Sequence, residues 1–84
     1  MTYCEQKLNS IYQNFKFSSS VYGYDPHLLR LLYNQVLEHL NKELYELKKA
    51  RCPHGELTYY GNYYRRIITQ YYNTQAMAWF FYTL

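Results

Sequence analysis

The sequence predicts an all-α protein in which a short N-terminal helix packs on a long antiparallel helical hairpin. Large apolar residues recur in pairs every four residues between positions 59 and 80, except that the fifth pair is Gln75-Ala76, and a second apolar seam with spacings of three and four runs from 29 to 47. Such spacings place side chains on one face of a helix, whereas a strand requires strict alternation. We expect residues 1–84 to form one domain, with helices at about 2–17, 25–51 and 56–82.

The first helix begins with a recognisable cap. Thr2 and Glu5 fit the S/T-x-x-E capping box, in which the two side chains satisfy free amide groups of the first turn. The apolar face that follows consists of Cys4, Leu8, Ile11, Tyr12 and Phe15. We expect this helix to end near Phe17.

A loop is predicted between residues 18 and 24. Three consecutive serines compete for backbone hydrogen bonds, and Gly23 permits a positive φ angle. Because Val21, Tyr22 and Tyr24 are large for a simple linker, we expect them to fold back onto the bundle.

The second helix has a clear start and a clear end. Asp25 is a favourable N-cap, and Pro26 follows at the first helical position, where its missing N–H costs nothing. Pro53 disfavours helical geometry at Cys52 and so ends the helix. The apolar seam comprises Leu29, Tyr33, Val36, Leu40, Leu44 and Leu47.

The third helix contains a possible interruption at Gly61-Asn62. This pair could form a two-residue hairpin turn, or Asn62 could cap a helix that starts later. The four-residue repeat continues through Gly61 without a phase change, which favours one helix. We expect Gly61 to let the second helix approach closely.

The apolar faces are wider than a monomer of 84 residues can bury. Since a repeat of four advances about 40° around a helix at each step, one straight neighbour cannot cover the whole stripe. We expect the Tyr59–Tyr64 end to pack on the second helix, and the Trp79–Phe80 end to face the first helix or a second molecule. Exposed aromatic surface of this kind marks a protein-binding site. The expected partner-contact residues are Tyr71, Tyr72, Trp79, Phe80 and Tyr82, and we expect a homodimer or binding to another protein.

The sequence offers no set of residues suited to catalysis or to cofactor or metal binding. His39 and Glu43 are spaced four apart, but no second pair completes a metal site. Cys52 lies near His54 without a glycine-rich loop that could stabilise an oxyanion. A Cys4–Cys52 disulfide is not expected, because the predicted helices separate the two residues by about 20 Å.

The favoured function is therefore that of a small non-enzymatic interaction module, such as an adaptor, an assembly factor or a stoichiometric inhibitor. The alternative is a nucleic-acid-binding module, since Tyr63-Tyr64 directly precede Arg65-Arg66, although nucleic-acid-binding proteins of this size usually carry more positive charge than +3. Its expected contacts are Lys48, Lys49, Arg51, Arg65 and Arg66. With no signal-peptide layout and no apolar run near about 20 residues, we expect a reduced, cytoplasmic protein without a membrane span.

Overall fold

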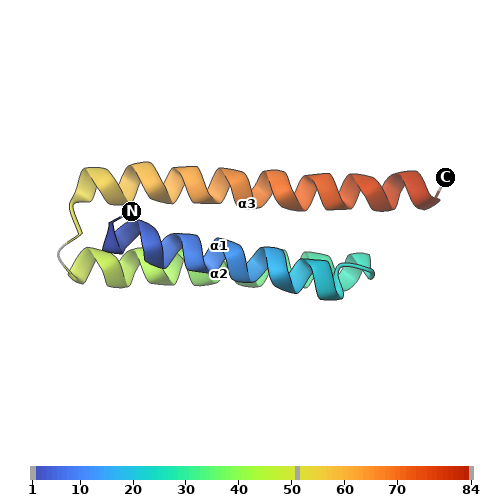
Figure 1. The fold of residues 1–84 in the computed structure, drawn as a ribbon, viewed down its shortest axis with the longest axis horizontal. Coiled ribbons are helices and arrows are strands. Elements are labelled where there is room, and N and C mark those ends of the chain that lie inside the picture. Colours follow the sequence, from blue (N-terminus) through green and yellow to red (C-terminus); the bar gives the residue numbers. More distant parts are fainter. Residues whose placement is uncertain (1, 51, 84) are drawn as a thin grey trace.

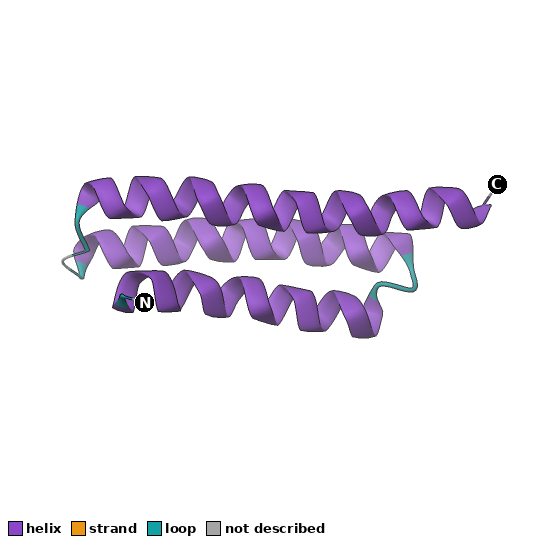
Figure 2. Ribbon diagram, turned by 45° about the horizontal axis from the view of Figure 1, so that its top comes forward, coloured by secondary structure: helices purple, strands orange, loops and turns teal. Residues whose placement is uncertain are grey.

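The protein is a rod of three helices that lie side by side. The computed structural model describes residues 2–50 and 52–83, with side chains described as far as Ala78. The helices are α1 (Tyr3–Tyr22), α2 (Pro26–Lys49) and α3 (His54–Thr83). Each contacts both others, in a molecule of 48 × 18 × 17 Å (Figure 1, Figure 2). The predicted all-α, three-helix arrangement is confirmed.

Helix α1 begins as predicted but ends later. The Thr2 hydroxyl accepts a hydrogen bond from the Glu5 amide at 3.3 Å, as in the capping box. The helix then continues beyond Phe17 to Tyr22, so the loop predicted from residue 18 is wrong. The serine hydroxyls donate to carbonyls three or four residues earlier, Ser19 to Phe15 and Ser20 to Phe17. Serine side chains that bond back in this way are compatible with a continuing helix.

The turn between α1 and α2 is short, and it requires Gly23 for a steric reason. The φ angle of Gly23 is −75°, so the expected positive φ is not observed. A Cβ atom at this position would instead collide with the Ser19 carbonyl oxygen and lie 2.8 Å from Gln75 Oε1. Asp25 then caps α2 as predicted, because its side chain accepts a hydrogen bond from the His27 amide at 2.8 Å.

One continuous core runs along the axis where the three helices meet. Leu8, Leu40 and Ile68 are each fully buried, one from each helix. Aromatic rings extend this core toward the α1–α2 turn. Tyr33 stacks on Tyr72 with ring centroids 4.2 Å apart, and Phe15 meets the Tyr71 ring at 5.9 Å. The remaining buried apolar residues of the cluster are Cys4, Ile11, Val36, Leu47, Cys52, Leu57 and Tyr64.

Helix α3 is continuous through Gly61 and Asn62, so the hairpin and the later helix start are both wrong. A Cβ atom on Gly61 would lie 3.0 and 3.2 Å from the two Leu44 methyl groups. The expected close approach of α2 is thus confirmed. The buried positions of α3 are Leu57, Gly61, Tyr64 and Ile68, with spacings of four, three and four. In the first two tyrosine pairs Tyr59 and Tyr63 are exposed and only Tyr60 and Tyr64 face the core, whereas Tyr71 and Tyr72 are both half-buried against it. The buried stripe from 57 to 68 follows its neighbours without the rotation expected from a strict repeat of four.

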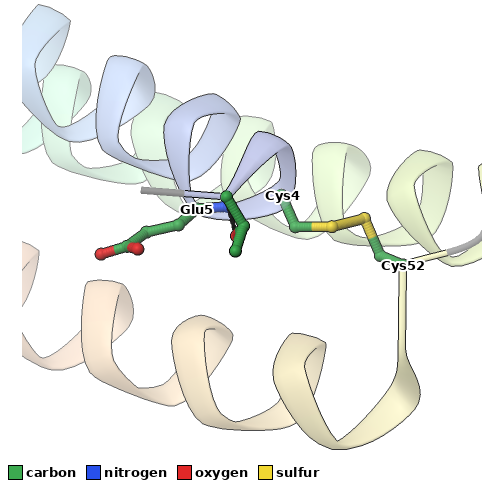
Figure 3. Close-up of a disulfide and its surroundings, with 4 residues drawn as sticks. Cys4, Glu5 and Cys52 are labelled. Carbon is green, nitrogen blue, oxygen red and sulfur yellow. Dashed lines mark hydrogen bonds between the residues drawn. A yellow bond between two sulfur atoms is a disulfide. The ribbon is translucent and has the colours of Figure 1, made fainter.

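A disulfide joins Cys4 to Cys52, with the two Cα atoms 6.2 Å apart (Figure 3). The expectation that these residues lie too far apart is wrong for two reasons. The five additional residues of α1 shift Cys4 along α2 by about 7.5 Å. The chain also folds back after α2, where the Cys52 amide donates to the Leu47 carbonyl at 3.2 Å, so Cys52 does not continue the helical rise.

Helix α3 is longer than its neighbours and extends past them at one end. It has 30 residues, whereas α2 has 24 and α1 has 20. Its C-terminal end projects beyond the α1–α2 turn (Figure 1). In the part of the chain that the structure describes, no helix is long and apolar enough to cross a membrane.

Candidate functional site

Exposed apolar side chains are unevenly distributed along the rod. In the half that contains the α1–α2 turn, several large apolar residues are exposed. Phe17 is 71% exposed and Tyr24 is 68% exposed. The others in this half are Val21, Tyr22, Leu31 and Met77. We define the turn-end surface as Phe17, Val21, Tyr22, Tyr24 and Met77.

The exposed aromatic residues of the other half are all tyrosines, and each has a neighbour against its ring. The ammonium groups of Lys7 and Lys49 lie 5.6 and 4.3 Å from the ring centroids of Tyr3 and Tyr45. Tyr59 and Tyr63 meet the rings of the tyrosines that follow them, at 5.1 Å in each case. These pairs give the four rings contacts that the turn-end surface lacks in the described residues. The exposed fractions of these four tyrosines, 38–66%, nevertheless overlap those of the turn-end surface. The turn end differs in chemistry, because the exposed large apolar residues without a polar group, Phe17, Val21, Leu31 and Met77, all lie in its half of the described rod.

A groove of about 480 Å³ lies next to the turn-end surface, between the α1–α2 turn and α3. On the α1 side it is lined by Ser19, Ser20, Gly23 and Tyr24. On the α3 side it is lined by Thr74, Gln75 and Ala78. Most of these side chains are small, so they leave room for a larger side chain from outside. Tyr24 belongs both to the turn-end surface and to the lining of the groove, so the two features adjoin at this residue.

The C-terminal half of α3 carries no charge. From Ile67 to the end of the sequence there is no Asp, Glu, Lys or Arg. Surface helices of monomeric proteins normally have a charged or polar outer face. This uncharged segment includes the part of α3 that projects beyond the turn (Figure 1). The exposed residues of this segment as far as Ala78 are Gln70, Asn73, Thr74, Met77 and Ala78, so its outer face is polar at first and becomes apolar toward the projecting end.

The expected partner-contact residues divide into two groups. Tyr71 and Tyr72 are half-buried and pack inside the bundle against Phe15 and Tyr33. The Tyr71 hydroxyl also accepts a hydrogen bond from Gln75 Nε2 at 3.0 Å. The side chains of Trp79, Phe80 and Tyr82 lie outside the described residues.

The structure brings only part of the expected basic strip together. Lys48 and Arg65 line one groove between α2 and α3. Lys49 lies over the Tyr45 ring, and Arg66 is exposed but does not line this groove. Arg51 lies outside the described residues.

Two tyrosine hydroxyls near Glu5 have perturbed acidity. Burial, with a further contribution from the Glu5 carboxylate, raises the pKa of Tyr64 to about 12. The Glu5 carboxylate and partial desolvation also raise the pKa of Tyr60. Both hydroxyls therefore stay protonated further into the alkaline range than an ordinary tyrosine, and that of Tyr64 donates a long hydrogen bond to Asn9 Oδ1 at 3.4 Å.

The described residues contain no cluster of three or more His, Cys, Asp or Glu side chains that could hold a metal ion. Both cysteines are paired in the disulfide. A thiol at Cys52 is therefore not available next to His54 in this structure.

Sequence reasoning missed the turn-end surface. Val21, Tyr22 and Tyr24 were expected to fold back on the bundle, but each is about half exposed or more. The spacing of Phe17, Val21 and Tyr24 by four and three was the available signal, because it continues a helical face through the serine run.

The fold and the two grooves define a disulfide-linked three-helix bundle with an apolar surface at one end. Comparison with protein-family models, with curated proteins and with solved structures gives no significant match for this chain.

Proposed function

We propose that this protein is a small non-enzymatic interaction module that binds another protein through its turn-end surface. The partner is a different protein or a second copy of the chain, and adaptor, assembly factor and stoichiometric inhibitor are the roles that such a module fills. The observation that carries the proposal is that the exposed large apolar side chains without a polar group, among them Phe17, Val21 and Met77, all lie in one half of the described rod.

The physical basis of the proposal is the cost of leaving apolar area in water. Each square ångström of apolar surface removed from water stabilises a complex by about 25 cal/mol before the costs of association. Aromatic residues that enter small-residue grooves supply much of this energy in protein interfaces. The turn end offers exposed Phe17 and Tyr24 rings for a partner to bury, and a groove of about 480 Å³ for a partner's side chain to enter.

The disulfide bears on the compartment in which the module would act. Disulfides persist in oxidising compartments and are rare in the cytosol. The expectation of a cytoplasmic location assumed reduced cysteines, whereas Cys4 and Cys52 are bonded. We therefore favour an oxidising environment over the cytoplasm.

Sedimentation velocity and the fluorescence of an apolar dye test the proposal on the purified protein. We expect self-association, dye binding or both in the wild type, and a loss of each on substitution Phe17→Asp. Tyr59→Asp is the matched control, because Tyr59 is 66% exposed on a helix in the opposite half of the rod. A wild-type protein that remains monomeric and binds no dye contradicts the proposal, as does an equal effect of the two substitutions.

A further inference from the structure

The groove between α2 and α3 is separate from the turn-end surface and has a different chemistry. It has a volume of about 320 Å³ and lies toward the disulfide end of the rod. The half-buried Leu44 contributes apolar surface above the buried Leu57, and the exposed Tyr45 provides an aromatic wall. The residues that line it include Lys48, His54 and Arg65, and no Asp or Glu is among them. We call this feature the cationic groove.

The positive charge of Arg65 is held in place without being neutralised. One terminal nitrogen donates to Asn41 Oδ1 at 2.8 Å, and the other makes a longer contact of 3.5 Å with Asn62 Oδ1. Both acceptors are neutral amide oxygens. A carboxylate in their place would cancel the charge, whereas an amide only orients the guanidinium. Arg65 is thus positioned on the groove with its charge available to a partner.

The apolar floor of the groove exists because the two helices approach closely at Gly61. The Leu44 methyl groups would lie only 3.0 and 3.2 Å from a Cβ atom on residue 61, so a side chain there would displace them. No residue of α1 lines this groove, so α1 covers only one side of the α2–α3 pair. The uncovered side is a shallow seam between two antiparallel helices, and such seams accept a further helix in helical bundles.

We propose that the cationic groove binds an amphipathic helical segment of a partner protein that carries leucine-type residues on one face and carboxylates beside them. The apolar residues would contact Leu44 and the ring of Tyr45, and the carboxylates would pair with Lys48 and Arg65. His54 and Arg65 are separated by about 16 Å along α3, which matches about three turns of a bound helix.

The groove favours an acidic helix over a nucleic acid. Single-stranded nucleic acids are held by several aromatic stacking platforms along a positive channel. The described lining of the cationic groove offers one aromatic wall, Tyr45, and an apolar floor, so it lacks a succession of stacking platforms. Nucleic-acid binding through Lys48 and Arg65 is therefore the competing outcome of the test.

The probe is a fluorescein-labelled peptide of about 15 residues, long enough to begin to form a helix in water. It carries Leu at positions three and four apart and Glu elsewhere, and a second peptide replaces each Glu by Gln. Fluorescence anisotropy with the full-length, disulfide-bonded protein measures binding. We expect the Glu peptide to bind and the Gln peptide not to bind. We also expect affinity to fall with added salt, because the cations are exposed.

Two double variants with the same change in net charge locate the binding site. Lys48→Glu/Arg65→Glu reverses the two groove cations and is expected to weaken binding by about tenfold or more. Lys42→Glu/Arg66→Glu reverses neighbouring cations that do not line the groove, and we expect less than about a twofold change. Circular dichroism and thermal melts confirm that both variants fold. Phe17→Asp is expected to leave peptide binding unchanged, so this test is independent of the turn-end surface.

Four results would overturn the proposal. These are failure of the Glu peptide to bind at low salt, equal binding of the Gln peptide, equal losses in the two double variants, and preferential binding of a labelled single-stranded oligonucleotide that Lys48→Glu/Arg65→Glu abolishes. The last result would establish the nucleic-acid alternative.

Discussion

At the residue scale, tyrosine has three distinct environments in this protein. Tyr64 is buried and tilted against the Tyr12 ring, Tyr33 and Tyr72 stack on each other at partial burial, and Tyr24 and Tyr59 are mostly exposed. The sequence predicts that the paired tyrosines belong to a helical face. It does not predict which member of a pair is buried, because that depends on the positions of the neighbouring helices.

The buried hydroxyl of Tyr64 gives a prediction for alkaline pH. Its pKa is raised from 10.0 to about 12 in the folded protein, so the hydroxyl ionises at a lower pH in the unfolded state than in the folded state. The stability that Tyr64 contributes is therefore fully present below pH 10 and is lost as the pH rises toward about 12. The hydrogen bond that Tyr64 donates to Asn9 Oδ1 is long, at 3.4 Å, so its loss costs little at neutral pH.

Tyr64→Phe is expected to change the free energy of unfolding by less than about 1 kcal/mol at neutral pH. Between neutral pH and about pH 11 it should lose less stability than the wild type, because it lacks this ionisable group. Urea unfolding at the two pH values measures the difference. An identical pH dependence of stability in the two proteins would show that ionisation of Tyr64 does not cause the loss of stability at alkaline pH.

At the element scale, caps and proline positions were predictable, whereas the end of α1 was not. Thr2, Asp25 and Pro26 act through neighbours within the same turn, so their roles follow from the local sequence. The serines after Phe17 can bond either in a loop or back into a helix. Tertiary packing decides between these states, and Ser19 is buried within the bundle.

The close approach at Gly61 predicts a difference between two glycines of α3. A side chain at Gly61 must displace Leu44, whereas a Cβ atom at Gly55 has no neighbour within 4 Å. Gly61→Val is expected to lower the free energy of unfolding by about 1–3 kcal/mol through overpacking. Gly55→Val should be neutral or slightly stabilising. Chemical denaturation compares the two variants, and equal effects would argue against a close helix contact at Gly61.

The disulfide predicts a large effect of cysteine replacement on stability. It closes a segment with a sequence separation of 48 residues, which restricts the unfolded chain. Cys4→Ala/Cys52→Ala is expected to lower the free energy of unfolding by about 2–4 kcal/mol. A reducing agent should destabilise the wild type by a similar amount and leave the double variant unchanged. If the reducing agent has no effect on the wild type, the two cysteines are not bonded in solution.

At the scale of the whole molecule, the sequence predicts three packed helices but not how they are aligned. The alignment depends on the length of α1 and on the reversal of the chain at Cys52. Because the predicted α1 was too short and Cys52 was assumed to continue the helical rise, Cys4 and Cys52 were predicted to lie too far apart for a disulfide. The same errors concealed the candidate site. With the shorter predicted helix, Val21 and Tyr24 lay in a loop that was expected to fold back on the bundle. In the structure α1 continues to Tyr22 and a short turn follows, so both side chains are exposed near the end of the rod.

The central claim is that a protein partner contacts the turn end of the bundle. Site-specific photocrosslinking tests it most directly, with a photoreactive phenylalanine placed at Phe17 in one variant and at Tyr59 in the other. The two positions have similar exposure, at 71% and 66%, and lie in opposite halves of the rod. In cells of the source organism, we expect a discrete crosslinked protein, either another chain or a second copy, from position 17 and not from position 59. Equal crosslinking from the two positions, or crosslinking from position 59 alone, would contradict the account.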